Sequence, residues 1–257
     1  MSLQAVIFDV DGTLADTERD AHRVAFNEAF REAGLPFSWD IPTYGEYLRV
    51  TGGQERMREF LDDHPHQPQL SDADIARIHR RKTDFYVEMV RSGRLSLRPG
   101  VLRLLDEMAA SGIQAAIATT TTPENVSTLL RTTLGPGAEE RFSCIGAGGI
   151  VKHKKPAPDI YVHVLGRLGL DPADCVAIED SNNGLRSALG AGLQVLVTRT
   201  EYTENQDFQG ALRVLSSLGD PGDMAQIVQG EETGAQVVVD LSLLRQWMAG
   251  PGTPFPG

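Results

Sequence analysis

Short apolar runs alternate with amphipathic stretches along most of the chain. The first run, residues 5–8 (Ala-Val-Ile-Phe), is apolar on both faces, which is typical of a strand buried in a parallel sheet. From residue 101 onward, strand-like runs and helical periodicity alternate, which predicts an α/β fold. Further strands are predicted over 113–118, 142–145, 175–178, 195–197 and 236–239, and helices over 101–111, 159–168 and 211–218, with one starting near 123 and one ending at 191.

Residues 16 to 93 lack strand-like runs and show helical periodicity instead. A segment with its own apolar faces is more economically explained as an inserted helical subdomain than as a loop of this length. The carboxyl-terminal end is rich in Pro and Gly, which favours a flexible tail. The predicted units are a core of residues 1–16 and 96–249, a helical domain of 17–95 and a tail of 250–257.

Two aspartates follow the first strand. Asp9 and Asp11 can point the same way because side chains alternate along an extended chain, and Gly12 permits a sharp turn beyond them. Carboxylates held this close repel each other unless a cation lies between them or one of them holds a proton. The pair therefore suits Mg²⁺ and acid/base chemistry at the carboxyl end of a strand, where α/β sheets bind ligands. The alternative is an acidic turn without a site.

Two later segments could bind phosphate. The threonine run 119–122 leads into a predicted helix start, where phosphate oxygens can bind, although such a run is also good capping chemistry. Lys155 precedes Pro156, which restricts its backbone and makes it a candidate counter-charge for a phosphate. The alternative is that the basic run 152–155 is a solvated face.

A second acidic pair, Glu179 and Asp180, follows the predicted strand 175–178. If this strand neighbours the first, the pair meets Asp9 and Asp11 and completes an oxygen-rich site of the kind Mg²⁺ prefers. The Gly-rich stretch 146–149 lacks the spacing of a dinucleotide-binding loop, so a Rossmann cofactor is discounted.

The composition narrows the class of partner. Lys and Arg number 24 against 35 Asp and Glu, a net charge of −11, which argues against nucleic acid, and no basic amphipathic run marks a membrane surface. Cys144 and Cys175 adjoin apolar runs and are interpreted as reduced core residues. No signal or membrane-spanning segment is recognised, so we expect a soluble, cytoplasmic protein, monomeric, with a small-molecule partner.

The polar motifs together carry a family resemblance. Asp9-Val10-Asp11-Gly12-Thr13, Thr119, Lys155 and Glu179-Asp180 occur in the order and approximate spacing of the four motifs of the haloacid dehalogenase superfamily. The helical insertion resembles the cap of the phosphoglycolate phosphatase and β-phosphoglucomutase branch. A closer likeness, to the CbbY proteins, sugar-bisphosphate phosphatases associated with the Calvin cycle, rests on 22–27, 52–56, 119–126 and 202–211. Gln54 departs from the lysine common at that position.

The resemblance implies a Rossmann-like parallel-sheet core with a helical cap, and a Mg²⁺-dependent phosphatase. Asp9 would be the nucleophile that forms an aspartyl-phosphate, and Asp11 the acid/base. Mg²⁺ would be held by Asp9, the backbone carbonyl of Asp11 and Asp180, with Glu179 nearby. The phosphoryl group would be bound by Gly12, Thr119, Thr120 and Lys155.

A sugar bisphosphate would also need a second phosphate site on the cap. Arg49 and Arg56 are the candidates, and ordinary helix-surface arginines are the alternative reading of both. His22 could contact substrate or simply pack near the expected hinge at residues 16–17, between the core and the helical domain. The implied substrate is xylulose 1,5-bisphosphate, which would otherwise inhibit the carbon-fixing carboxylase. The alternatives are a phosphomutase, a phosphatase of another metabolite such as phosphoglycolate, and a non-catalytic phosphate-binding regulator.

Overall fold

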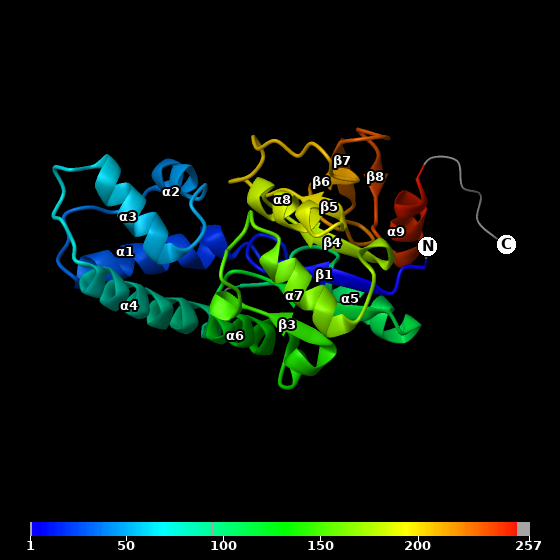
Figure 1. The fold of residues 1–257 in the computed structure, drawn as a ribbon, viewed down its shortest axis with the longest axis horizontal. Coiled ribbons are helices and arrows are strands. Elements are labelled where there is room, and N and C mark those ends of the chain that lie inside the picture. Colours follow the sequence, from blue (N-terminus) through cyan, green and yellow to red (C-terminus); the bar gives the residue numbers. More distant parts are fainter. Residues whose placement is uncertain (1, 94, 251–257) are drawn as a thin grey trace.

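A mostly parallel sheet runs through one half of the molecule (Figure 1). The computed structural model describes residues 2–93 and 95–250. In that part of the chain the sheet has eight strands in the order β3-β2-β1-β4-β5-β6-β7-β8, and only the pairings of β7 are antiparallel. The strands are β1 (Ala5–Phe8), β2 (Gln114–Ala118), β3 (Cys144–Gly146), β4 (Cys175–Glu179), β5 (Gln194–Thr198), β6 (Arg213–Leu215), β7 (Ala225–Gln229) and β8 (Gln236–Val237).

The first strand lies between β2 and β4, parallel to both. Phe8, the last residue of β1, is level with Ile117 of β2 and Ile178 of β4. The residues that follow these three therefore emerge at one edge of the sheet, as carboxyl ends of parallel strands do. This register brings three of the four sequence motifs together.

Alternate residues of the strands face two separate apolar layers. Val6 and Phe8 belong to one buried cluster and Ala5 and Ile7 to the other, as the period of two in a strand requires. Burial on both faces explains why β1 is a continuous apolar run. The first layer is covered by α5 (Val101–Ser111), α6 (Pro123–Leu134) and α9 (Leu241–Ala249), and the second by α7 (Asp159–Leu168) and α8 (Asn182–Gly190).

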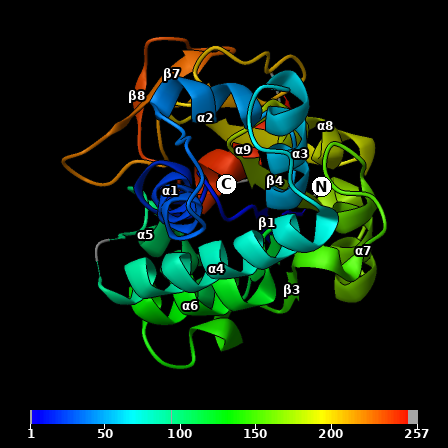
Figure 2. The ribbon, with the colours of Figure 1, turned by 90° about the vertical axis from the view of Figure 1, so that its left-hand side faces the viewer.

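The helices between β1 and α5 form the other half of the molecule (Figure 1). They enclose an aromatic cluster in which the rings of Phe26 and Trp39 lie 4.9 Å apart. Helix α4 continues from this cluster to the core, runs beside α6 (Figure 2), and buries Val87 and Val90 there. These helices are η1 (Glu18–His22, a π-helical turn), α1 (Arg23–Glu32), α2 (Ile41–Tyr47), α3 (Gly53–Asp63) and α4 (Asp72–Arg91); three short 3₁₀ turns in the other half are η2 (Ala138–Arg141), η3 (Gly148–Ile150) and η4 (Pro172–Asp174).

The α/β prediction is confirmed, but the carboxyl-terminal part of the chain differs from expectation. The helix predicted over 211–218 is wrong, because β6 occupies this segment and pairs with β5 through Val197 and Val214. The sequence also gave no sign of β7 or α9. The predicted tail lies outside the described residues except for Gly250. None of the described helices is long and apolar enough to cross a membrane.

Candidate active site

A tight turn follows β1 and carries the first motif. The backbone of Gly12 has a φ of +84°, a conformation that residues with a side chain rarely adopt. A Cβ at this position would lie 2.2 Å from Asp180 Oδ2, so the turn packs its backbone directly against that carboxylate. Only glycine fits here.

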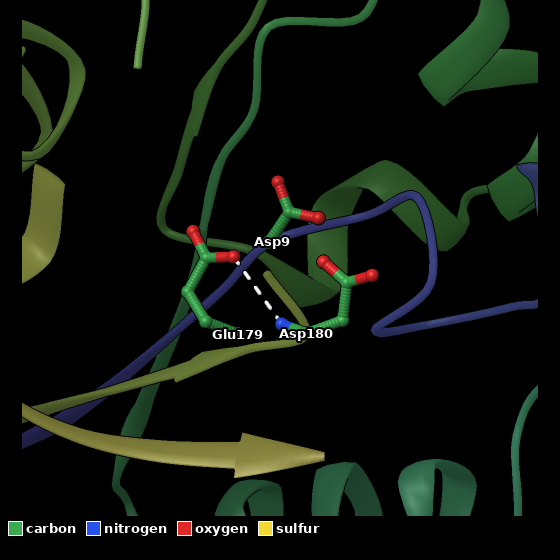
Figure 3. Close-up of side chains that lie close together, drawn as sticks. All are labelled: Asp9, Glu179 and Asp180. Atoms are coloured by element: carbon green, nitrogen blue, oxygen red, sulfur yellow. Dashed lines mark hydrogen bonds between the residues drawn. The ribbon is translucent and has the colours of Figure 1, made fainter. Parts of the chain in front are cut away.

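Three carboxylates meet beyond the ends of β1 and β4. Asp9, Glu179 and Asp180 are buried, and each offers one oxygen such that the three oxygens lie within 4.8 Å of one another. Figure 3 shows the three side chains converging, with the Asp180 backbone N–H donating to Glu179 Oε2 at 3.3 Å. The predicted meeting of the two acidic motifs is thus observed for Asp9 with Glu179 and Asp180. The Asp11 side chain is not among these ligands, so its predicted part in a metal site rests on its backbone carbonyl.

Burial makes this group costly in its charged form. It raises the pKa of Asp9 to about 8, against the opposing effect of Lys155, and the charges of Glu179 and Asp11 raise it further. Burial, together with Asp9 and Glu179, also raises the pKa of Asp180 well above its usual range. A hard divalent cation would relieve both costs, so the oxygen-only donor set fits Mg²⁺.

Lys155 is buried at the centre of this group. Its Nζ lies 2.6 Å from Asp9 Oδ1 and 2.6 Å from Glu179 Oε1. The Tyr161 hydroxyl from α7 also donates to Glu179 Oε1, at 2.6 Å. Although burial alone would lower the pKa of Lys155, the two carboxylates raise it, so this lysine is a permanent cation. The alternative of a solvated basic residue is excluded for Lys155.

Thr119 lies at the carboxyl end of β2 and is buried. Its hydroxyl accepts a hydrogen bond from the Thr121 N–H at 3.2 Å, and both Thr119 and Thr120 line the same cavity as Asp9 and Lys155. The threonine run also caps a helix, because Thr122 Oγ1 accepts from Asn125 N at the start of α6. Within this run, Thr122 therefore caps a helix, whereas Thr119 and Thr120 are placed to bind phosphate.

The Asp11 side chain contacts residues at the start of the helices. Its Oδ1 accepts from the Thr17 hydroxyl at 2.5 Å and lies 3.0 Å from His22 Nε2. The other ring nitrogen of His22, Nδ1, is 2.5 Å from Lys82 Nζ, and the ring stacks on Tyr86 at 4.2 Å. When Lys82 donates to Nδ1, the ring N–H at Nε2 is directed at Asp11.

This chain of contacts fixes the charge of Asp11. Burial acts to raise its pKa, but His22, the Thr17 hydroxyl and Lys82 together lower it to about 2. Burial lowers the pKa of Lys82 to about 8 despite the nearby charges of Glu18 and Asp11. Asp11 is thus an anion above a very low pH, whereas Lys82 titrates near neutrality.

A cavity of about 660 Å³ opens above these groups, between the core and the helices. Arg49 and Arg56 both line it; Arg49 is an exposed arginine, as the alternative reading expects, whereas Arg56 is not. Arg49 follows the end of α2 and pairs with Glu59 at 3.1 Å, and Arg56 is buried in α3. His22 lies in an adjoining cavity of about 310 Å³.

The sequence motifs did not reveal the residues that support the site. Lys82 follows Ile75 and Ile78 on the buried face of α4, and a lysine in an apolar stripe was the available signal. Tyr161 and Arg98 are buried polar residues of the same kind. From the sequence alone, such residues would be assigned to the core or to the surface, and not to a functional site.

Two comparisons identify the family. A family model described as haloacid dehalogenase-like hydrolase matches residues 3–192. Over 252 residues the chain is 48% identical to protein CbbY, plasmid, of Cupriavidus necator, which covers 96% of this chain and 98% of that protein. The chain belongs to the haloacid dehalogenase-like hydrolases. The predicted family, including its CbbY-like branch, is confirmed.

Solved structures agree with this assignment. The crystal structure of CbbY from Rhodobacter sphaeroides in complex with phosphate has a TM-score of 0.79 and 46% identity, and it covers 84% of this chain and 94% of that one. A variant of that CbbY in complex with xylulose 1,5-bisphosphate matches equally well. A phosphorylated carbohydrates phosphatase of Thermotoga maritima is 31% identical over 197 residues, covering 75% of this chain and 83% of that protein. The predicted enzyme class, a haloacid dehalogenase-type phosphatase, is confirmed.

Proposed function

We propose that this enzyme is a Mg²⁺-dependent phosphatase that hydrolyses one phosphate ester of a sugar bisphosphate, xylulose 1,5-bisphosphate. The observation that carries the proposal is the position of Asp9, which meets Lys155 and two further carboxylates at the base of a 660 Å³ cavity. The complex of the related CbbY with that bisphosphate supports the choice of substrate.

The carboxylates of Asp9 and Asp180 and the backbone carbonyl of Asp11 would hold the metal, with Glu179 close by. When bound, Mg²⁺ would neutralise charge on the phosphoryl oxygens and on the carboxylates around them. Lys155, which contacts Asp9, would share this task, and Thr119 would donate to a phosphoryl oxygen.

In the first step, a carboxylate oxygen of Asp9 attacks phosphorus and forms the aspartyl-phosphate. The bond between phosphorus and the sugar oxygen breaks, and protonated Asp11 gives its proton to that oxygen. Asp11 must therefore gain a proton before this step, which the approach of a negatively charged phosphate favours by raising its pKa.

In the second step, water attacks phosphorus, the bond to Asp9 breaks, and phosphate leaves. Asp11 takes the proton of the attacking water. Its pKa of about 2, which persists against burial because His22 and Thr17 lower it, keeps it in the charged form that can act as this base.

We also propose a separate role for each half of the molecule. Residues 1–16 and 96–249 would be the catalytic core, and 17–95 a cap that closes over the sugar and excludes bulk water. The reaction would take place in the cytoplasm, where the free thiols of Cys144 and Cys175 stay reduced.

The test is inorganic phosphate release with Mg²⁺, comparing kcat/KM for xylulose 1,5-bisphosphate, ribulose 1,5-bisphosphate, phosphoglycolate and glucose 1-phosphate. A preference for the first of at least a hundredfold, about 2.7 kcal/mol of differential transition-state binding, is expected. Asp9→Asn should lose turnover while remaining folded, and is the control for contaminating phosphatases. A flat profile, or isomerisation of glucose 1-phosphate without phosphate release, would refute the assignment.

A further inference from the structure

The cations around the two cavities differ in whether they are already neutralised. Of the arginines lining the larger cavity, Arg49 pairs with two carboxylates, Glu59 at 3.1 Å and Asp63 at 3.5 Å. A guanidinium held in this way must break existing ion pairs before it can bind a ligand anion. Arg49 is therefore a weak candidate for a second phosphate site.

The guanidinium of Arg56 is also engaged, but in hydrogen bonds inside the helical half. Its guanidinium is buried and donates to the backbone carbonyls of Tyr47 at 3.2 Å and Val50 at 3.4 Å, and to the Tyr44 hydroxyl at 2.8 Å. Glu18 Oε2 lies 3.9 Å away. These contacts hold α2 and α3 together, so Arg56 supports the wall of the cavity.

Arg186 is the exception. It belongs to α8, is exposed and lines the larger cavity. Among the residues that the structure describes, no hydrogen bond, ion pair or ring contact engages its guanidinium. In a chain with a net charge of −11, an arginine that lines the 660 Å³ cavity without a carboxylate partner is free to bind an anion.

The neighbours of Arg186 place it where three elements meet. Asn183, three residues earlier in α8, donates to the Arg49 carbonyl at 3.1 Å and to Thr51 Oγ1 at 3.2 Å, which holds the loop after α2 against the core. Asn182, one turn before Arg186, donates to the Asp207 carbonyl at 2.6 Å in the loop after β5. Arg186 therefore faces a space bounded by α8 and two loops that also line the cavity.

The smaller cavity offers no comparable cation in the described residues. Lys82 contacts His22, and Lys154 pairs with Glu55 at 2.5 Å. Burial lowers the pKa of His79 to about 4, so it is uncharged at neutral pH. The larger cavity is thus the better place for a second negative group.

We infer that Arg186 binds the phosphate of the substrate that is not hydrolysed, and so gives the enzyme its preference for a bisphosphate. A planar guanidinium without a partner can form two parallel hydrogen bonds to phosphate oxygens. This inference rests on the proposed function, because it requires a substrate with two phosphates and its reacting phosphate at Asp9.

The experiment compares kcat/KM for xylulose 1,5-bisphosphate with that for xylulose 1-phosphate and xylulose 5-phosphate. Arg186→Gln should lower kcat/KM for the bisphosphate by tenfold or more, mainly through KM, and change it by less than twofold for the more reactive monophosphate. Arg186→Lys should retain part of the preference. The matched control is Arg167→Gln, an exposed arginine of α7 that lines neither cavity, and it should behave as wild type.

The outcomes separate the two proposals. If the wild-type enzyme prefers the bisphosphate and Arg186→Gln keeps that preference, this inference is wrong and the proposed function stands. Equal losses on bisphosphate and monophosphate would also overturn it, since they would indicate a general defect. A wild-type enzyme without any preference for the bisphosphate would overturn both.

Discussion

Asp9 and Asp11 are two residues apart, yet their pKa values shift in opposite directions, to about 8 and to about 2. Burial raises the first, with Lys155 opposing it, whereas contacts with His22 and Thr17 outweigh burial at the second. Two carboxylates with separated pKa values can take different parts in one reaction. The contact that decides this separation is the one between Asp11 and His22.

Lys82 should control the activity through His22. Lys82→Met removes the donor to His22 Nδ1, so the ring no longer has a fixed tautomer, and kcat should fall by about 10- to 100-fold. Because burial lowers the pKa of Lys82 to about 8, wild-type kcat should decline above that pH as the lysine loses its proton. Measured pH profiles should show this decline in the wild type and not in Lys82→Met.

The control for that prediction is Lys152→Met, which removes an exposed lysine that lines neither cavity. It should keep both the rate and the alkaline decline. An unchanged pH profile in Lys82→Met would show that Lys82 only fills space beneath His22.

Gly12→Ala should weaken metal binding more than it weakens the fold. The added Cβ would lie 2.2 Å from Asp180 Oδ2, so this carboxylate must move, and the φ of +84° adds a backbone cost of about 1 to 2 kcal/mol. We expect the Mg²⁺ concentration for half-maximal activity to rise by tenfold or more. Gly34→Ala is the matched control, because it has a φ of +69° and nothing within 4 Å of the new Cβ. It should lose stability only.

At the scale of elements, one buried arginine joins the turn after β1 to the ends of two strands. Arg98 donates to the Gly12 carbonyl and, at 2.8 Å each, to the carbonyls of Thr198 at the end of β5, Arg199 directly after it and Ser216 directly after β6. Its Nε lies 3.5 Å from Asp16, where the chain leaves for the helices. Arg98 therefore contacts the turn at Gly12, the segment at Asp16 and the loop after β5 at the same time.

Arg98→Met should cost about 3 kcal/mol or more in unfolding free energy, because several buried carbonyls lose their donor. It should also lower kcat per folded molecule, since the Gly12 turn loses its support. Arg103→Met is the control for stability alone. Arg103 also donates to three carbonyls, of Gly219 at 2.8 Å, Val239 at 2.9 Å and Leu218 at 3.5 Å, but lines neither cavity. Equal kcat losses in the two variants, after correction for folded fraction, would contradict this role of Arg98.

The same scale explains which elements could be predicted from the sequence. Strands β1, β2 and β4 are buried on both faces, so each is a continuous apolar run followed directly by a polar motif. The segment that forms β6 carries apolar residues at spacings that fit either period, and pairing with β5 decided the outcome. Strand β7 alternates buried and exposed residues only over Ala225 to Ile227, which is too short a pattern to recognise.

Some candidate site residues could likewise be predicted from the sequence, and others could not. The motif residues could be predicted because they follow strands in a fixed order, and their meeting depends only on parallel pairing. The residues that surround Asp11 could not be predicted in this way. Lys82 acts on Asp11 through His22, and these two residues are 60 positions apart in the sequence. Long-range packing of this kind leaves no local pattern.

For the whole molecule, the acidic site should make stability depend on Mg²⁺ and pH together. Without metal, folded Asp9 keeps its proton up to about pH 8, whereas its ordinary pKa is 3.8. Between these values the folded state binds more protons than the unfolded state, so raising the pH lowers the free energy of unfolding. The shift of Asp11 to about 2 acts only below pH 4 and does not affect this window.

We therefore expect the Tm of the metal-free protein to fall between about pH 6.5 and pH 8, above the range in which His79 acts in the opposite direction, and less steeply in Asp9→Asn. Free Mg²⁺ at a hundred times its Kd should add about 2.7 kcal/mol. In a protein of about this size, each kcal/mol of added stability raises the Tm by roughly 2 to 4 °C. Thermal unfolding with EDTA or with Mg²⁺ measures both effects. A Tm of the EDTA-treated protein that rises over this pH range, in parallel in the wild type and Asp9→Asn, would contradict the role of Asp9.

The surroundings of Asp9 and Asp11 come from different halves of the molecule. Lys155 and Glu179, which surround Asp9, belong to the sheet half, whereas His22 and Lys82, which govern Asp11, belong to the inserted helices. If Asp9 attacks phosphorus as proposed, the helices can change, and with them the choice of leaving alcohol, without altering that attack. A single ancestral sheet could in this way give rise to many specialised enzymes by exchanging its insert.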